Sequence, residues 1–242
     1  MNTRKNFLIN IEGIDGAGKG TQTQILYKTL LEMKYPAKFL SFPDYDTFFG
    51  KMVGKYLNGG YGTLSSVPVE FATLLYALNR WEFFRDLPAK NENEQPNLFV
   101  IDRYVPSNIA HQIAKVQQSE RKDLFLWLNK LEHEVFGIPK PDIVLVLDVD
   151  PDSAANQVLQ KNRRSYTDKK MDIHEENKSY LKKVREVFLE LCNTEENYFL
   201  IDCNDEKGVK PIDFISAKIW KIVEENLKKH GISCRDAETL RE

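Results

Sequence analysis

Seven residues near the N-terminus have the types and the spacing of a phosphate-binding loop. Residues 13–19 read Gly-Ile-Asp-Gly-Ala-Gly-Lys, which fits the pattern G-x-x-x-x-G-K, between a short apolar run and a segment of helical period. The glycines let backbone N–H groups converge on phosphate oxygens, and the start of a helix adds partial positive charge. The lysine side chain adds a point charge suited to the β and γ phosphates. The pattern predicts a nucleotide phosphate site made of Gly13, Gly16, Ala17, Gly18, Lys19, Gly20 and Thr21.

The residue after this lysine departs from the usual pattern. Gly20 stands where a Ser or Thr hydroxyl would contact Mg²⁺, and Thr21 comes one position late. We therefore expect the metal to be held mainly by phosphates and water, with weaker direct ligation by the protein.

A second polar group follows the apolar run 98–101. Asp102 and Arg103 end this run, so both side chains are expected at the sheet edge where ligands bind. Asp102 suits Mg²⁺, directly or through water, and Arg103 suits bidentate contact with a phosphate. An ordinary ion pair at a strand end is the alternative, and the nearby phosphate loop favours the ligand-binding interpretation.

Positioning these groups requires a sheet whose strands end at one edge. Five short apolar segments alternate with segments of helical period, which favours a parallel sheet covered by helices. We expect an α/β fold with three αβα layers, a five-stranded parallel sheet with helices on both faces, and a short lid. The expected strands are 7–11, 38–42, 98–101, 142–147 and 198–201, and the main helices are 19–34, 67–87, 106–116, 121–136, 151–162, 174–191 and 211–229.

Length and composition indicate one soluble domain spanning residues 1–242. The apolar fraction of 42% and the net charge of -2 give no bulk attraction to nucleic acid or to an anionic membrane, and no span of about 20 apolar residues occurs. The three cysteines are widely spaced and form no CxxC pair, and the N-terminus lacks the apolar region of a signal peptide. We expect a cytoplasmic protein with reduced thiols and no nucleic-acid or membrane partner.

Four motifs, in order along the first half of the chain, resemble the thymidylate kinase family of nucleoside monophosphate kinases. They are Ile-Glu-Gly-Ile-Asp-Gly-Ala-Gly-Lys at 11–19, Phe42-Pro43, Asn-Arg-Trp-Glu at 79–82, and Asp-Arg-Tyr at 102–104 with Ser107. The second half matches mainly through strand spacing and a basic segment. The resemblance implies phosphorylation of dTMP to dTDP with ATP and Mg²⁺, and a homodimer.

The resemblance also implies an acceptor site for dTMP. Arg80 lies in a mostly apolar helix and needs a partner, which could be Glu82, another carboxylate, or the acceptor's base or phosphate. Tyr76, one turn earlier, could stack on the base or be part of the core. Asn108 and Gln112 could pair with the thymine. The full expected set is Asp15, Phe42, Pro43, Tyr45, Tyr76, Arg80, Arg103, Ser107, Asn108, His111 and Gln112; Asp15 and Asp102 are the expected metal contacts.

Catalysis, on the same resemblance, involves Lys19, Arg103 and arginines of a lid. Some relatives carry Arg where this chain has Gly16, and members without that Arg take it from the lid. The basic stretch 161–170 contains Arg163 and Arg164, so we expect a lid at about 161–172. A solvated charged face is the alternative. The tail at about 230–242 has no clear pattern.

Two other functions are possible from the sequence. A kinase for AMP, UMP or a nucleoside is the nearer one: Gly20 slightly favours an adenylate kinase, although the Asp-Gly-Phe-Pro-Arg segment of that family is absent. A regulatory ATPase or nucleotide-dependent switch is the other. The chain lacks the Asn-Lys-x-Asp guanine signature, and Arg80 together with Arg103 suits a second phosphate-bearing substrate.

Overall fold

A computed structural model describes residues 6–85, 97–159, 178–206 and 208–234 of the chain. Its centre is a five-stranded sheet in the order β2-β3-β1-β4-β5, with every neighbouring pair parallel. The strands are β1 (Asn6–Glu12), β2 (Ala37–Ser41), β3 (Asn97–Asp102), β4 (Ile143–Asp148) and β5 (Tyr198–Asp202). The sequence prediction of a five-stranded parallel sheet is confirmed.

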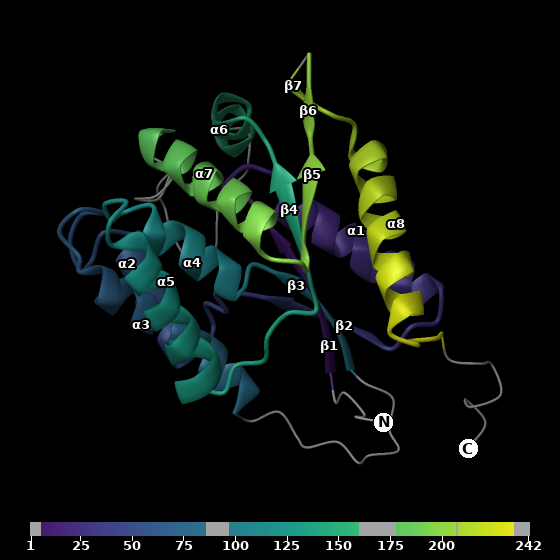
Figure 1. Cartoon of the computed structure of the whole chain (residues 1–242), viewed down its shortest axis with the longest axis horizontal. Helices are drawn as coiled ribbons and strands as arrows, with labels where there is room; N and C mark the ends of the chain where they lie inside the picture. The colour runs from purple at the N-terminus through teal and green to yellow at the C-terminus, as the bar shows by residue number, and fades with distance from the viewer. Residues whose placement is uncertain (1–5, 86–96, 160–177, 207, 235–242) are drawn as a thin grey trace.

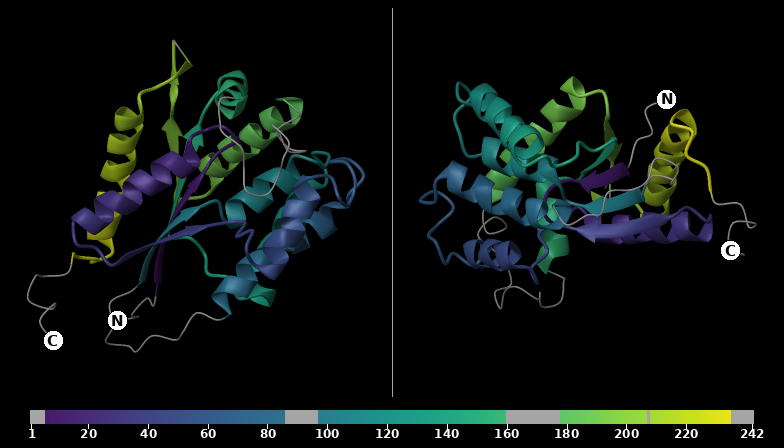
Figure 2. Two further views of the ribbon diagram at one scale, coloured as in Figure 1. Left: turned by 180° about the vertical axis from the view of Figure 1, so that it is seen from behind. Right: turned by 90° about the horizontal axis from the view of Figure 1, so that it is seen from below.

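Helices cover both faces of the sheet (Figure 1). On one face lie α1 (Lys19–Glu32) and α8 (Ile212–Lys229), which run side by side when the molecule is seen from behind (Figure 2). The other face carries α4 (Val105–Ile113) and α7 (Lys178–Thr194), with α2 (Phe48–Leu57), α3 (Val69–Phe84), α5 (Arg121–Asn129) and α6 (Pro151–Leu159) around them. A small antiparallel pair, β6 (Asn204–Asp205) and β7 (Gly208–Val209), follows β5.

The burial of the elements follows from their sequence patterns. All six residues of β4, Ile-Val-Leu-Val-Leu-Asp, are buried, as expected for a central parallel strand covered on both faces. The α8 helix buries residues at intervals of four, which places one apolar stripe against the sheet: Ile215, Ile219, Val223 and Leu227. None of the helices in the described ranges is long and apolar enough to cross a membrane.

One helix differs from its prediction. The segment expected as a single helix at 121–136 is α5 followed by a π-helical turn, η1 (Lys130–Val135). A π turn adds one residue to the helical repeat and so rotates the side chains that follow it. Hydrophobic spacing alone did not reveal this turn.

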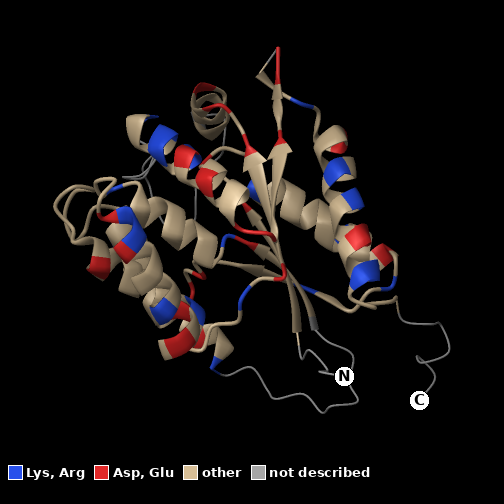
Figure 3. Ribbon diagram, in the orientation of Figure 1, with Lys and Arg blue, Asp and Glu red and all other residues tan. Residues whose placement is uncertain are grey.

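Charged residues gather at the carboxyl ends of the strands, along one edge of the sheet. Glu12 ends β1, Asp102 ends β3, and the loop between β1 and α1 lies at the same edge. Acidic residues also end β4 and β5 (Figure 3), where Asp148 pairs with Arg185 of α7 and Asp202 pairs with Lys210.

Candidate active site

The loop between β1 and α1 has the shape of a phosphate cradle because its glycines adopt conformations that other residues rarely do. Gly13, Gly16 and Gly18 have φ values of 139°, 86° and 85°. A Cβ on Gly16 would lie 2.1 Å from the carbonyl oxygen of Ala154 in α6, and one on Gly13 would lie 2.6 Å from the oxygen of Leu147. The absence of an arginine at position 16 therefore has a physical reason: the backbone of α6 occupies the space of any side chain.

Lys19 begins α1 and is almost fully buried beneath this loop. Its Nζ donates a hydrogen bond to the carbonyl oxygen of Ile14, at 2.7 Å. Burial lowers the pKa of Lys19 to about 8, and the positive charge of Arg103 acts in the same direction. The lysine thus lies inside the loop.

The unusual Gly20 lies against Asp102. A Cβ on Gly20 would be 3.1 Å from Asp102 Oδ2, so a larger residue would crowd this carboxylate. The other oxygen, Oδ1, is buried and has no hydrogen-bond partner among the described residues. Thr21 is exposed. An unpartnered buried carboxylate oxygen beside a phosphate loop fits a hard cation such as Mg²⁺.

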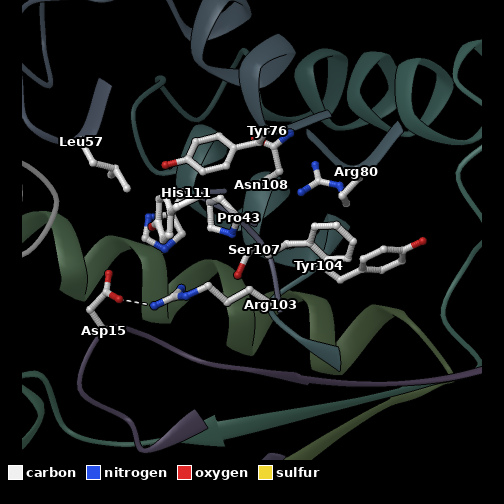
Figure 4. Close-up of a pocket in the computed structure, with 12 residues that line it drawn as sticks. Asp15, Pro43, Leu57, Tyr76, Arg80, Arg103, Tyr104, Ser107, Asn108 and His111 are labelled. Carbon is white, nitrogen blue, oxygen red and sulfur yellow. Dashed lines mark hydrogen bonds and ion pairs between the residues drawn. The ribbon is translucent and has the colours of Figure 1, made fainter. Parts of the chain in front are cut away.

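Arg103 holds a backbone conformation that is uncommon for a residue with a side chain. Its φ is 62°, and its N–H donates to the carbonyl oxygen of Ile11 at 3.2 Å. This turn directs the guanidinium to Asp15 of the phosphate loop, with which it forms an ion pair (Figure 4). Burial opposes its charge, but Asp15, Asp102 and Glu12 together raise the pKa of Arg103 above its usual value.

The sequence analysis assigned no function to Glu12. Its position at the end of an apolar strand, where a charged residue needs a partner, could have indicated one. It is fully buried, and its Oε1 accepts hydrogen bonds from the N–H groups of Tyr104 and Ser107, at 2.7 and 3.2 Å. Its Oε2 accepts from Ser107 Oγ at 2.5 Å. Burial raises the pKa of Glu12. The side chain therefore caps the start of α4 and fixes the Asp-Arg-Tyr turn to β1.

A cavity opens beside Arg103. It contains about 510 Å³ of space free of protein atoms, including the part open to solvent. Ten of the eleven residues expected to bind the acceptor line it, and only Gln112 does not. Leu57 and Tyr104 complete the wall (Figure 4): the lining is Asp15, Phe42, Pro43, Tyr45, Leu57, Tyr76, Arg80, Arg103, Tyr104, Ser107, Asn108 and His111.

Arg80 is held by a carboxylate from another element. Its Nε donates to Glu132 Oε2 at 3.1 Å, and its Nη2 pairs with Glu132 Oε1; both side chains are buried. Glu132 belongs to the π turn, so it was not identified from the sequence. Glu82, the partner considered from the sequence, instead accepts from the N–H of Phe49.

The neighbouring Asn79 fixes the loop after β2. Its side chain accepts from the N–H of Asp44 at 3.0 Å and donates to Thr47 Oγ1 at 2.9 Å. This loop carries Pro43 and Tyr45, which line the cavity, and the Phe42–Pro43 peptide bond is cis. The Asn-Arg-Trp-Glu motif therefore builds one wall of the cavity as well as contributing Arg80 to it.

Asn108 and Gln112 belong to a buried network. Asn108 Nδ2 donates to Glu132 Oε1 at 2.9 Å and to the carbonyl oxygen of Thr73 at 3.2 Å. Gln112 donates to Asn108 Oδ1 at 3.3 Å and accepts from Lys115 Nζ at 2.8 Å. These bonds engage both ends of the Gln112 amide behind the cavity wall, away from the position expected for a residue that contacts the base.

The lid residues Arg163 and Arg164 lie outside the described residues, as does the whole segment 161–172. Apart from Gln112, the remaining residues expected from the sequence gather at the phosphate loop and the neighbouring cavity. The phosphate loop and the cavity are joined by the ion pair between Asp15 and Arg103, so the edge can hold two phosphate-bearing ligands side by side.

Comparisons with known proteins agree with this arrangement. The thymidylate kinase family model matches residues 11–210. The chain is 32% identical to a thymidylate kinase of Danio rerio over 228 residues, which cover 93% of this chain and 96% of that protein. It is also 32% identical to a probable thymidylate kinase of Archaeoglobus fulgidus over 231 residues, covering 93% and 99% of the two chains.

Solved structures give the same result. A thymidylate kinase from Candida albicans superposes with a TM-score of 0.65 at 28% identity, over 92% of each chain. A thymidylate kinase from Ehrlichia chaffeensis, at 20% identity and a TM-score of 0.60, has the same fold. With the phosphate loop, the Asp-Arg-Tyr turn and the cavity in place, these matches show that the chain belongs to the thymidylate kinase family.

Proposed function

We propose that this enzyme transfers the γ-phosphoryl group of ATP to dTMP, giving ADP and dTDP. The observation that carries the proposal is the junction of two sites: a phosphate cradle at the start of α1 and an aromatic cavity, linked by Asp15 and Arg103. A nucleotide triphosphate in the cradle and a nucleoside monophosphate in the cavity would place their phosphates next to each other. Such positioning, with charge stabilisation, is most of what phosphoryl transfer requires.

The charged residues divide the work between the two substrates. Lys19 and the loop N–H groups bind the β and γ phosphates of ATP, and Lys19 stabilises the charge that develops on the transferred group. Arg103 binds the phosphate of the acceptor. We assign Arg163 and Arg164, which lie outside the described residues, to the charge of the transferring group, because Gly16 supplies no arginine and the backbone of α6 leaves no room for one there.

Asp102 and Asp15, whose charges both act on Arg103, would hold the Mg²⁺ that accompanies ATP. The unpartnered buried Oδ1 of Asp102 supports this assignment. Held there, the ion would supply positive charge that offsets the negative charge of the ATP phosphates.

Base selection follows from the geometry of Arg80. Glu132 engages Nε and Nη2, and the guanidinium still lines the cavity with donors only. A donor suits the carbonyl at the 4-position of thymine and opposes the amino group of cytosine. Tyr76, also in the wall, offers a ring on which the base can stack.

The proposal is tested with a panel of acceptors in an assay that couples ADP release to a detectable reaction. We expect dTMP to have the highest kcat/KM. dUMP should follow, because the loss of one methyl group weakens transition-state binding by about 1 kcal/mol. dCMP, AMP and GMP should be far weaker, because leaving a buried donor unpaired costs about 1–3 kcal/mol. A best rate with AMP or with a free nucleoside would overturn the thymidylate assignment, and ADP release without any acceptor would favour an ATPase.

The assembly and the compartment of the enzyme are part of the same proposal. We infer a homodimer, supported by two exposed apolar side chains one turn apart on α3, Phe71 and Leu74. Sedimentation of the purified protein measures this directly. We also infer a cytoplasmic location, supported by the free cysteines Cys192, Cys203 and Cys234 in the described part of the chain.

A further inference from the structure

Lys115 is a partly buried lysine behind the acceptor cavity, and the proposed function gives it no role. It follows α4 and does not line the cavity. Burial lowers the pKa of its amino group to about 7. Its hydrogen-bond partners among the described residues are a phenol and an amide, so no carboxylate offsets the cost of placing a charge there. The lysine therefore contributes little to the stability of the fold.

Two hydrogen bonds connect Lys115 to two helices. Its Nζ donates to the hydroxyl oxygen of Tyr56 on α2 at 2.9 Å, and to Gln112 Oε1 on α4 at 2.8 Å. An amino group has at least two N–H bonds whether or not it is protonated, so both contacts hold in either state. Tyr56 and Gln112 are both 0% exposed. Lys115 therefore fastens the end of α2 to the end of α4.

The first contact leads to the aromatic wall of the cavity. The Tyr56 ring meets the Tyr76 ring edge to face, with centroids 6.2 Å apart and an interplanar angle of 89°. Leu57 follows Tyr56 in the chain, and both Leu57 and Tyr76 line the cavity (Figure 4). These residues pack in a hydrophobic cluster of α2 and α3 that is separate from the main core. The bond from Lys115 to Tyr56 therefore ties this cluster to α4.

The second contact leads to the polar wall of the cavity. The lysine donates here, so the oxygen of the Gln112 amide faces Lys115 and its NH₂ group faces Asn108 Oδ1, at 3.3 Å. The Asn108 amide has its oxygen toward Gln112 and its Nδ2 toward Glu132 Oε1, at 2.9 Å. A carboxylate can only accept, so donors and acceptors agree along the whole chain from Lys115 to Glu132.

We propose that Lys115 is a positioning residue of the acceptor site. Through Tyr56 it holds the ring of Tyr76, on which the base stacks. Through Gln112 it holds the Asn108 amide in the same wall. The inference rests on the proposed function for the identity of the nucleotide in the cavity, whereas the two contacts of Lys115 do not depend on it.

Binding of dTMP to the ligand-free enzyme, measured by calorimetry, tests this role apart from catalysis. Tyr56→Phe removes one hydroxyl and keeps the ring, and Lys115→Met removes the amino group and keeps most of the side-chain length. We expect each to raise the Kd of dTMP about 3- to 10-fold, the size of one hydrogen bond, and to leave the Kd of ATP nearly unchanged. The matched control is Lys55→Met, since Lys55 precedes Tyr56 on α2 but is exposed; neither Kd should change.

A double variant and thermal melts distinguish positioning from a general loss of packing. Tyr56→Phe combined with Lys115→Met should weaken dTMP binding clearly less than the product of the two single effects, because both remove the same hydrogen bond. The ligand-free Tm of Lys115→Met should fall little, because the cost of the buried charge disappears together with the two bonds. A merely structural lysine gives the opposite result, a lower Tm with an unchanged Kd of dTMP.

The results separate this inference from the proposed function. An unchanged Kd of dTMP in both single variants, an equal rise in the Kd of ATP, or effects that multiply fully in the double variant overturns the inference in an enzyme that still phosphorylates dTMP. A wild type that does not bind dTMP overturns the proposed function instead. The same variants are then compared with the nucleotide that ranks first in the acceptor panel, and an unchanged Kd for that nucleotide overturns the inference as well.

Discussion

Single side chains in this site are held by partners that are distant in the sequence. Arg80 depends on Glu132, Ser107 on Glu12, and Arg103 on Asp15. Each pair joins two elements, so neither member can be assigned from its own segment. The sequence indicated that Arg80 needs a partner because a buried charge alone is costly, but it could not identify Glu132, which the π turn directs inward.

The Arg80–Glu132 pair gives a prediction at this scale. In Glu132→Gln an amide replaces the carboxylate that accepts hydrogen bonds from both Arg80 and Asn108. The NH₂ group of that amide would then face a donor of one of these two residues. Removing one partner of a buried ion pair costs about 3–5 kcal/mol. We expect the free energy of unfolding, measured with urea, to fall by that amount. The KM for dTMP should rise at least about 10-fold, because a hydrogen bond to a charged group contributes about 1.5–3 kcal/mol.

Glu134→Gln is the matched control, since Glu134 lies in the same π turn but is exposed. It should change the free energy of unfolding by less than about 0.5 kcal/mol. Equal effects of the two substitutions would mean that the turn, and not the ion pair, supports the cavity.

At the scale of elements, the sequence predicted the strands and most helices because their hydrophobic patterns are strong. The buried strand β4 and the four-residue spacing in α8 are clear signals. The π turn was not predicted, because a one-residue insertion in a helical repeat leaves no distinct composition. The outer wall of the cavity, with Leu57 and Tyr104, depends on packing between α2, α3 and α4, which periodicity does not encode.

The packing of the phosphate loop against α6 can be tested by comparing two glycines. Gly16 and Gly18 have nearly the same φ, 86° and 85°, so an alanine pays a similar conformational cost of about 1–2 kcal/mol at either position. Only Gly16 has α6 backbone 2.1 Å from the new Cβ, whereas Gly18 has nothing within 4 Å. We expect Gly16→Ala to lower the free energy of unfolding of the ligand-free protein clearly more than Gly18→Ala. Equal losses would show that α6 moves freely away from the loop.

The lid gives a second prediction at this scale. Arg163 and Arg164 lie outside the described residues, and their assignment rests on the basic density of 161–170 and on the space excluded at Gly16. An arginine that reaches the transferring phosphoryl group is worth about 10³–10⁵ in rate. We therefore expect at least one of Arg163→Ala and Arg164→Ala to lower kcat strongly in a steady-state assay, with little change in the KM for dTMP. Unchanged kcat in both single variants and in the double variant would identify this segment as a solvated surface.

For the whole molecule, the arrangement of the sheet explains why two ligands can meet. The β1 and β3 strands lie next to each other, so the loop after β1 and the turn after β3 reach the same edge. One carries Lys19 and the other carries Arg103, and Arg80 comes to the cavity from α3. The two proposed binding sites are therefore adjacent but use different residues.

This separation predicts that each ligand's stabilisation can be removed independently. A ligand at 100 times its Kd adds about 2.7 kcal/mol, and for a chain of this size each kcal/mol raises Tm by about 2–4 °C. We expect Lys19→Ala to lose most of the rise in Tm caused by ATP and to keep the rise caused by dTMP, because Lys19 lies in the cradle. Arg80→Met should do the reverse.

Each variant is compared with its own ligand-free Tm, so the loss of stability from an unpaired Glu132 does not enter the comparison. The measurement is a thermal melt with ATP alone, with dTMP alone, and without ligand. If both variants lost both responses to the same degree, the assignment of Lys19 to ATP alone and of Arg80 to dTMP alone would be wrong.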